Sequence, residues 1–186
     1  MQHKTLSLLL FCLLLSPLLA LSSQYDRKAA QAQAEKGIAL NNNSEEEISF
    51  YQKALEIDPT YALAYYNIAN IYFDRQEYKK AIPLYEKAVS YLKNDYDLQF
   101  NLALAHFKNR DSVAALLILN EIVRKAPGDL ESLFFQSKIF AATESTTNLN
   151  AARKNMMRIL SAHTKADLRM RSQRLLDRIE KKLGLK

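Results

Sequence analysis

The chain has 186 residues, of which only three are Gly and four are Pro. Turn residues are scarce beside the many Ala, Leu, Tyr, Lys and Glu residues, so the composition favours helices and excludes a sheet protein of this size. The net charge of +6 is uneven, because residues 153–186 hold eleven basic and three acidic residues and the body before them is mildly acidic.

Residues 1–22 predict a signal peptide. Residues 6–19 are almost wholly apolar, which is short for a spanning helix but typical of a signal-peptide core. Ala20 and Ser22 are small residues suited to a signal-peptidase site, so we expect cleavage after Ser22. The alternative is an uncleaved segment that anchors the chain in a membrane. Either outcome predicts an exported chain, periplasmic in a bacterium.

A regular internal repeat, with a period of about 34 residues, organises the chain after this segment. Blocks that begin at Ala62, Tyr96 and Leu130 align without a gap until past Ala142, and residues 49–59 supply the second half of an earlier block. Small residues recur within the blocks and would let paired helices approach closely, while bulky residues fill the space between them. One such pair cannot bury its apolar face alone, so we expect the pairs to stack.

These positions resemble the tetratricopeptide repeat (TPR) family. The block from Ala62 supplies Tyr65, Ile68, Ala69, Tyr72, Ala81, Tyr85 and Ala88, and the block from Tyr96 supplies Leu102, Ala103, Ala115 and Pro127. The resemblance implies an all-α, right-handed superhelical solenoid of antiparallel helix pairs, with about 3.5–4 repeats and a C-terminal capping helix. The implied TPR domain covers residues 23–163, with repeats at about 28–61, 62–95, 96–129 and 130–163.

Residues 164–186 predict a basic amphipathic capping helix, after a polar loop expected over residues 143–150. Its apolar residues recur on one helical face, and they are Leu168, Leu175, Leu176, Ile179 and Leu183. That face would cover the last repeat, and the charged faces would contact water. A second interpretation of the basic residues is weak contact with an acidic partner or an anionic membrane surface. Nucleic acid is not expected as a partner, because export would remove the chain from it.

Neither a catalytic set nor a metal site is recognisable in the sequence. His3, His106 and His163 match no ligand spacing, and three isolated glycines form no phosphate-binding loop. We therefore expect no enzyme activity, no cofactor and no metal. Three acidic residues follow Ser44, which we expect to cap the helix they begin. A cation or partner site at these acids is the alternative.

The TPR resemblance also implies partner-binding residues on the concave surface of the helix pairs. The fifth, ninth and twelfth positions of the implied first helices hold Tyr66, Asn70, Phe73, Phe100, Phe107, Phe134 and Lys138. Such a ladder would give a bound peptide aromatic anchors with a few polar contacts. The alternative is that the chain covers these rings itself, with the segment after Ser23 or with its last helix.

A protein–protein interaction scaffold or adaptor is the function that the resemblance implies, with a partner protein or peptide in the concave groove during assembly of an envelope complex. The family's clamp for a peptide C-terminus is not expected, because Tyr66, Glu131 and Phe135 stand where that clamp uses basic residues. An exported module that binds a small ligand or an envelope polymer remains the alternative. An enclosed pocket would favour that alternative, and an open groove favours a peptide.

Overall fold

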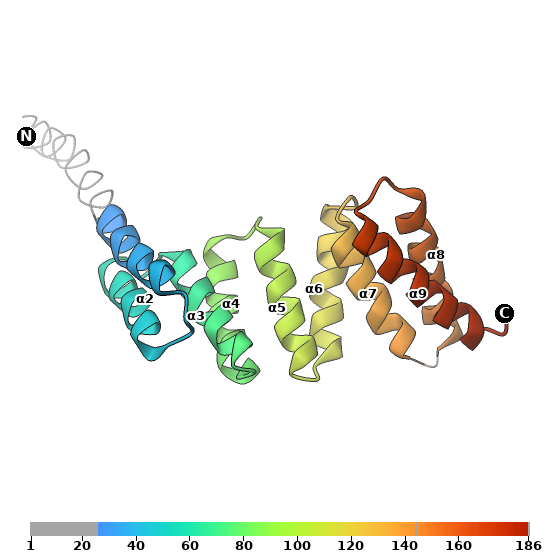
Figure 1. Ribbon diagram of the computed structural model, residues 1–186, viewed down its shortest axis with the longest axis horizontal. Helices are drawn as coiled ribbons and strands as arrows, with labels where there is room; N and C mark the ends of the chain where they lie inside the picture. Colours follow the sequence, from blue (N-terminus) through green and yellow to red (C-terminus); the bar gives the residue numbers. More distant parts are fainter. Residues whose placement is uncertain (1–25, 144, 186) are drawn as a thin grey trace, which may run out of the picture. The chain divides into compact units, whose positions relative to one another are not determined.

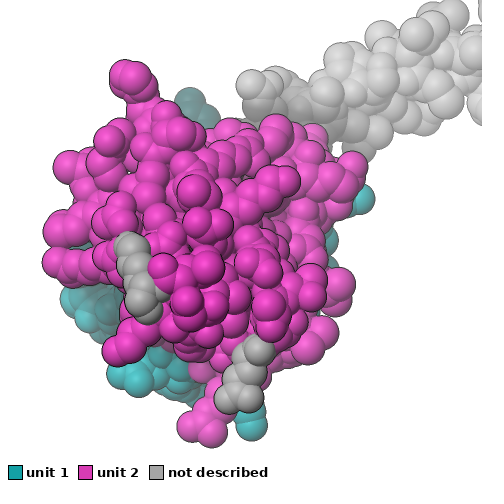
Figure 2. Space-filling view, turned by 90° about the vertical axis from the view of Figure 1, so that its right-hand side faces the viewer, with its two compact units in different colours: residues 1–93 teal, residues 94–186 magenta. Residues whose placement is uncertain are grey.

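A computed structural model of the chain describes residues 26–143 and 145–185 (Figure 1). The predicted signal peptide, residues 1–22, lies outside the described residues. All regular secondary structure in the described part is helical, and the helices form antiparallel pairs joined by short turns, which confirms the predicted all-α fold class. The chain divides into two compact units, residues 1–93 and residues 94–186, which Figure 2 colours separately. Among the described helices, none has both the length and the apolar character needed to cross a membrane.

Unit 1 contains a helix over residues 26–40, followed by α2 (Glu45–Ile57), α3 (Ala62–Asp74) and α4 (Tyr78–Tyr91). Its core joins Ala30 and Ala34 of the first helix to Tyr51 of α2 and Ile68 of α3. Gly37 lies directly against the Tyr51 ring, where an added Cβ would come within 2.7 Å of a ring carbon. The first helix can therefore approach α2 this closely only because residue 37 has no side chain.

At the start of α2, the N-cap and the acidic residue Glu47 form hydrogen bonds within unit 1. Ser44 is the N-cap and accepts a hydrogen bond from the Glu47 amide at 3.1 Å, which confirms the predicted cap. The buried Glu47 carboxylate accepts from the amides of Asn42 (2.8 Å) and Asn43 (2.9 Å) and from the Tyr51 hydroxyl (3.2 Å). These contacts account for a buried carboxylate without a bound cation.

Unit 2 contains α5 (Tyr96–Lys108), α6 (Ser112–Lys125), α7 (Leu130–Ala142), α8 (Thr146–Ser161) and α9 (Ala166–Lys182). The helices α5 and α6 form one pair, α7 and α8 form the next, and α9 packs on α8 and α7. Because α3, α5 and α7 begin at the first residues of the three aligned blocks, the helix starts follow the sequence period. The side chains of Asp95, Asp111 and Asp129 each accept a hydrogen bond from the amide three residues later, which fixes the starts of α5, α6 and α7.

The expected loop over residues 143–150 is wrong in its second half. Helix α8 already begins at Thr146, and Ser145 is its N-cap, accepting from the Asn148 amide at 3.4 Å. Polar residues are as common in a capped first helical turn as in a loop, so their composition alone did not separate the two.

A row of polar side chains joins three helices of unit 2. The Gln136 side chain on α7 donates to Asn120 of α6 at 2.7 Å. Asn155 of α8 donates in turn to Gln136 at 3.2 Å and to the Ser137 hydroxyl at 3.0 Å. Gln136 and Ser137 are buried, and these bonds satisfy their polar atoms inside the unit.

Candidate functional site

In unit 1, three predicted site residues surround one buried tyrosine, Tyr85 of α4. The Tyr85 hydroxyl donates to the Asn70 side-chain oxygen at 2.6 Å. The Tyr66 ring lies 6.0 Å from the Tyr85 ring between centroids, and the Phe73 ring lies edge-on at 6.5 Å. Burial raises the pKa of Tyr85 well above its ordinary value, so the hydroxyl stays a hydrogen-bond donor. The structure therefore brings Tyr66, Asn70 and Phe73 together as part of the packing between α3 and α4.

In unit 2, two predicted rings meet a third that was not among the predicted site residues. Phe100 and Phe107 of α5 pack edge-on against Phe135 of α7, with centroids 5.6 and 5.2 Å apart. The Lys138 ammonium lies 5.6 Å from the Phe135 ring centre and 6.0 Å from that of Phe107. The sequence analysis named Phe135 only as a residue that departs from the family's clamp, and Asn67 stands at the equivalent position of an earlier repeat. The sequence signal for Phe135 was the replacement of a polar residue by an aromatic one at this repeat position.

Phe134 is covered by the chain itself. It is 9% exposed and belongs to a core formed with α8 and α9. The Arg171 guanidinium of α9 lies 5.0 Å from the Phe134 ring centre and also pairs with Glu131 at 2.7 Å. Phe134 is therefore not open to a partner while α9 is in place, which is the alternative that the sequence left open for these rings.

A cleft of about 310 Å³ lies between α7 and α9, with Phe107 of α5 in its wall. The lining residues are Phe107, Lys138, Ala141, Ala142, Leu175, Arg178, Ile179 and Lys182. Three of the eight are cationic and none is acidic. The Lys182 ammonium donates to the Ala141 carbonyl at 2.8 Å, at the C-terminal end of α7, where a positive charge is favourable.

The lining of this cleft combines apolar surface with positive charge. Alanine and aliphatic side chains form an apolar floor, and exposed cations stand beside it. Such a surface suits a segment that carries a carboxylate next to an apolar side chain. Among residues 26–143 and 145–185, no group of His, Cys, Asp or Glu could hold a metal ion.

Sequence reasoning placed two of these lining residues, Phe107 and Lys138, among the candidate site residues. It treated Arg178 and Lys182 only as part of the basic tail. The missing information was the orientation of α9 on α7, because a helical period gives the apolar face but not the flank that meets a neighbouring helix.

Comparisons with known proteins agree with the division of the chain into repeated helix pairs. A tetratricopeptide repeat model matches residues 64–129, and a TPR repeat model matches residues 48–73. The probable UDP-N-acetylglucosamine–peptide N-acetylglucosaminyltransferase SPINDLY of Oryza sativa subsp. japonica is 43% identical over 51 residues, which are 27% of this chain. Those residues span only 6% of that protein, so the similarity does not extend to most of the rice protein.

Two solved structures have a similar fold. MamA protein is similar with a TM-score of 0.70 and 14% identity, over 86% of this chain and 84% of its own. YrrB, a TPR protein described as having an unusual peptide-binding site, is similar with a TM-score of 0.61 and 25% identity, over 81% of this chain and 83% of its own. The two repeat models, which together match residues 48–129, show that this is a tetratricopeptide repeat protein, and the regular spacing of α3, α5 and α7 agrees with them.

Proposed function

We propose that the chain is a non-catalytic adaptor that binds a segment of a partner protein in the cleft between α7 and α9. The observation that carries the proposal is the set of three cations, Lys138, Arg178 and Lys182, around an apolar floor that contains no acidic side chain. YrrB, which is 25% identical, is a TPR protein with a peptide-binding site, and this supports a peptide as the occupant here.

The cleft favours an acidic segment with an apolar residue beside the acid. Arg178 and Lys138 are exposed and can form charge-assisted hydrogen bonds with a carboxylate. Ala141 and Ala142 leave space next to Phe107 for an aliphatic or aromatic side chain. A volume of about 310 Å³ holds one or two side chains, so the rest of the segment would lie outside the cleft.

We place this adaptor in the bacterial periplasm, in the assembly of an envelope complex. The signal-peptide pattern of residues 1–22 supports export, and Ser22 provides the cleavage site. N-terminal sequencing of the protein from fractionated cells tests the location. A soluble chain that begins at Ser23 is the expected result, and a membrane-bound chain that retains Met1 contradicts cleavage and favours the anchor.

Site-specific photo-crosslinking tests the cleft. A photoreactive amino acid replaces Ala142, an exposed lining residue, in the chain produced in its own cells. We expect a crosslinked adduct that is lost when Lys138→Glu and Arg178→Glu are added together. The matched control, Lys79→Glu with Lys108→Glu, changes the net charge equally at exposed positions outside the cleft and should keep the adduct. An adduct that survives the cleft substitutions contradicts the proposal.

A further inference from the structure

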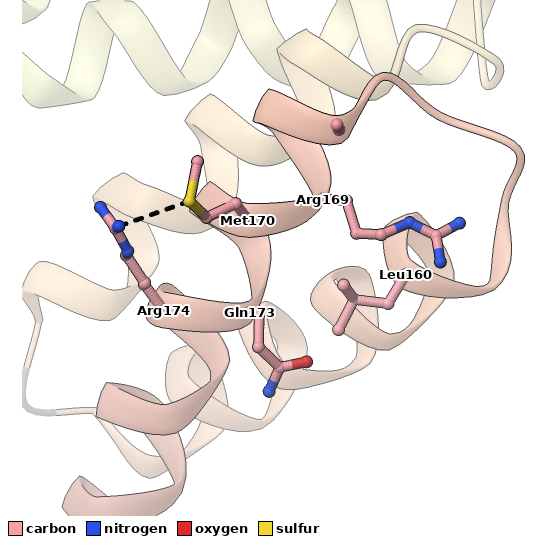
Figure 3. A pocket seen from close by; sticks show the side chains of 6 residues that line it. Leu160, Arg169, Met170, Gln173 and Arg174 are labelled. Carbon is pink, nitrogen blue, oxygen red and sulfur yellow. Dashed lines mark hydrogen bonds between the residues drawn. The ribbon is translucent and has the colours of Figure 1, made fainter.

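A second pocket lies on another face of α9. Its volume is about 530 Å³, and Leu160 of α8 lines it together with Ala166, Arg169, Met170, Gln173 and Arg174 of α9. Figure 3 shows Arg174 and Met170 on one side, Arg169 and Leu160 on the other, and Gln173 between them. The pocket shares no residue with the cleft between α7 and α9. It therefore needs an explanation separate from peptide binding.

The two arginines of this pocket direct their guanidinium groups to neutral partners. The Arg169 guanidinium donates to the Ala162 carbonyl at 3.2 Å, and the Arg174 guanidinium contacts the Met170 sulfur at 3.4 Å. Both of these partners are neutral. Gln173, between the arginines, donates to Asp177 at 3.2 Å. Two exposed guanidinium groups remain to attract an anion.

Exposed apolar side chains stand next to these cations. Met170 is 49% exposed in the pocket wall. Met157 is also 49% exposed and lies three residues before Leu160 on α8, so these two side chains share a helix face. Cations beside exposed apolar side chains are typical of helices that lie in a membrane interface.

We infer that this face of α8 and α9 docks on an anionic phospholipid surface. Arg169 and Arg174 pair with headgroup phosphates, which a planar guanidinium can hold through two hydrogen bonds. Met170 enters the boundary between headgroups and acyl chains, while Leu160, which is half-buried against the core of unit 2, stays in the pocket wall. The basic composition of residues 153–186 adds long-range attraction to the same surface. The cleft, on the other face of α9, can hold its peptide at the same time.

Vesicle co-sedimentation of the full chain, as isolated from its cells, tests this inference. One set of vesicles is pure phosphatidylcholine, and the other contains about one-third phosphatidylglycerol. We expect stronger binding to the anionic vesicles, and a loss of about thirtyfold in the partition coefficient when Arg169→Glu and Arg174→Glu are combined. Met170→Ser should weaken binding by a smaller factor, because it removes apolar contact and leaves the charge unchanged.

The charge-matched control is again Lys79→Glu with Lys108→Glu, which should bind the anionic vesicles as the unaltered chain does. Circular dichroism checks that each variant is folded. If the double glutamate variant unfolds, Arg169→Gln with Arg174→Gln removes the charges more gently and replaces it.

Equal binding to both kinds of vesicle overturns the inference, and so does unchanged binding of the arginine variant. Binding of soluble polyglutamate through the same arginines, without vesicle binding, also overturns it and assigns the face to an acidic protein. The arginine variant should retain the crosslink at Ala142, so the vesicle and crosslinking results fail or succeed separately.

Discussion

Two pairs of aromatic rings occupy equivalent positions in the two units but pack on different partners. Tyr66 and Phe73 of unit 1 stand one repeat before Phe100 and Phe107 of unit 2. The first pair packs on Tyr85, which belongs to the second helix of the same repeat. The second pair packs on a ring from the first helix of the following repeat. Residues at equivalent repeat positions therefore lie on the same face of their helices but pack against different neighbours.

A paired substitution accounts for the difference. In unit 1, Tyr85 and Asn70 form a hydrogen bond, whereas the residues one repeat later are Leu119 and Leu104. Both leucines belong to the apolar cluster that contains Phe135. A polar pair inside one helix pair is thus replaced by aliphatic packing, and the missing ring comes from the next repeat.

The largest expected effect comes from removing the ring on which unit 2 relies. Phe135→Ala should lower the free energy of unfolding by about 3–5 kcal/mol, because Phe100 and Phe107 lose their common contact and a cavity remains. Urea denaturation measures the change. Phe140→Ala, at a half-buried ring on the same helix, is the control and should cost less. Equal losses of stability for the two variants would show that Phe135 does not contribute more to the stability of unit 2 than Phe140 does.

A smaller effect should come from breaking the polar pair of unit 1. Tyr85→Leu should destabilise the chain by about 2–4 kcal/mol, because it removes a buried ring and leaves Asn70 without its donor. Adding Asn70→Leu reproduces the leucine pair of unit 2 and should recover about 1 kcal/mol. The recovery is read from a double-mutant cycle in urea. Strictly additive costs would mean that the two residues are not a coupled pair.

Glycines give a matched test, with one residue in each unit. Gly37→Ala should cost about 1–3 kcal/mol, because its Cβ would overlap the Tyr51 ring in unit 1. Gly128→Ala in unit 2 should be close to neutral, since no atom lies within 4 Å of the added Cβ. Thermal unfolding of both variants under the same conditions measures the difference. A neutral Gly37→Ala would mean that the first helix can move away from α2 without loss.

The smallest expected effect concerns one surface position that differs between the units. Glu121 of unit 2 pairs with Arg124 and Lys125, whose hydrogen bonds lower its pKa from 4.5 to about 2. Lys87 stands one repeat earlier and lies over the Tyr91 ring instead. A lowered carboxyl pKa stabilises the fold above the unfolded value, and this stabilisation is lost as the pH falls towards the folded value.

Glu121→Gln should therefore be slightly destabilising at about pH 7, and the difference from the unaltered chain should disappear by about pH 2. Lys87→Gln should show no such acid-dependent change, because its contact with Tyr91 involves no carboxylate. Urea unfolding of the three proteins across this pH range provides the comparison. A Glu121→Gln effect that is constant with pH would contradict the ion-pair explanation.

The helix pairs could be predicted from the sequence, but the contacts between aromatic rings could not. Regular recurrence of small and bulky residues predicted the repeats that begin at Ala62, Tyr96 and Leu130, because that period follows from how one helix pair packs. The choice of partner for Phe100 depends on which neighbouring side chain fills the space, and a repeat alignment does not contain that information. The cleft beside Lys138 likewise required the orientation of α9, a helix outside the exact period.

The row of polar side chains across α6, α7 and α8 limits how the repeats could be exchanged. Gln136 and Ser137 stand where the preceding repeat has Leu102 and Ala103. A chimera that carries a copy of residues 96–108 in place of α7 would preserve the spacing of small and bulky residues. It would also leave Asn155 without both of its hydrogen-bond acceptors inside the unit. The repeats therefore share a backbone pattern, but the hydrogen bonds between α7 and α8 require the side chains of the last helix pair.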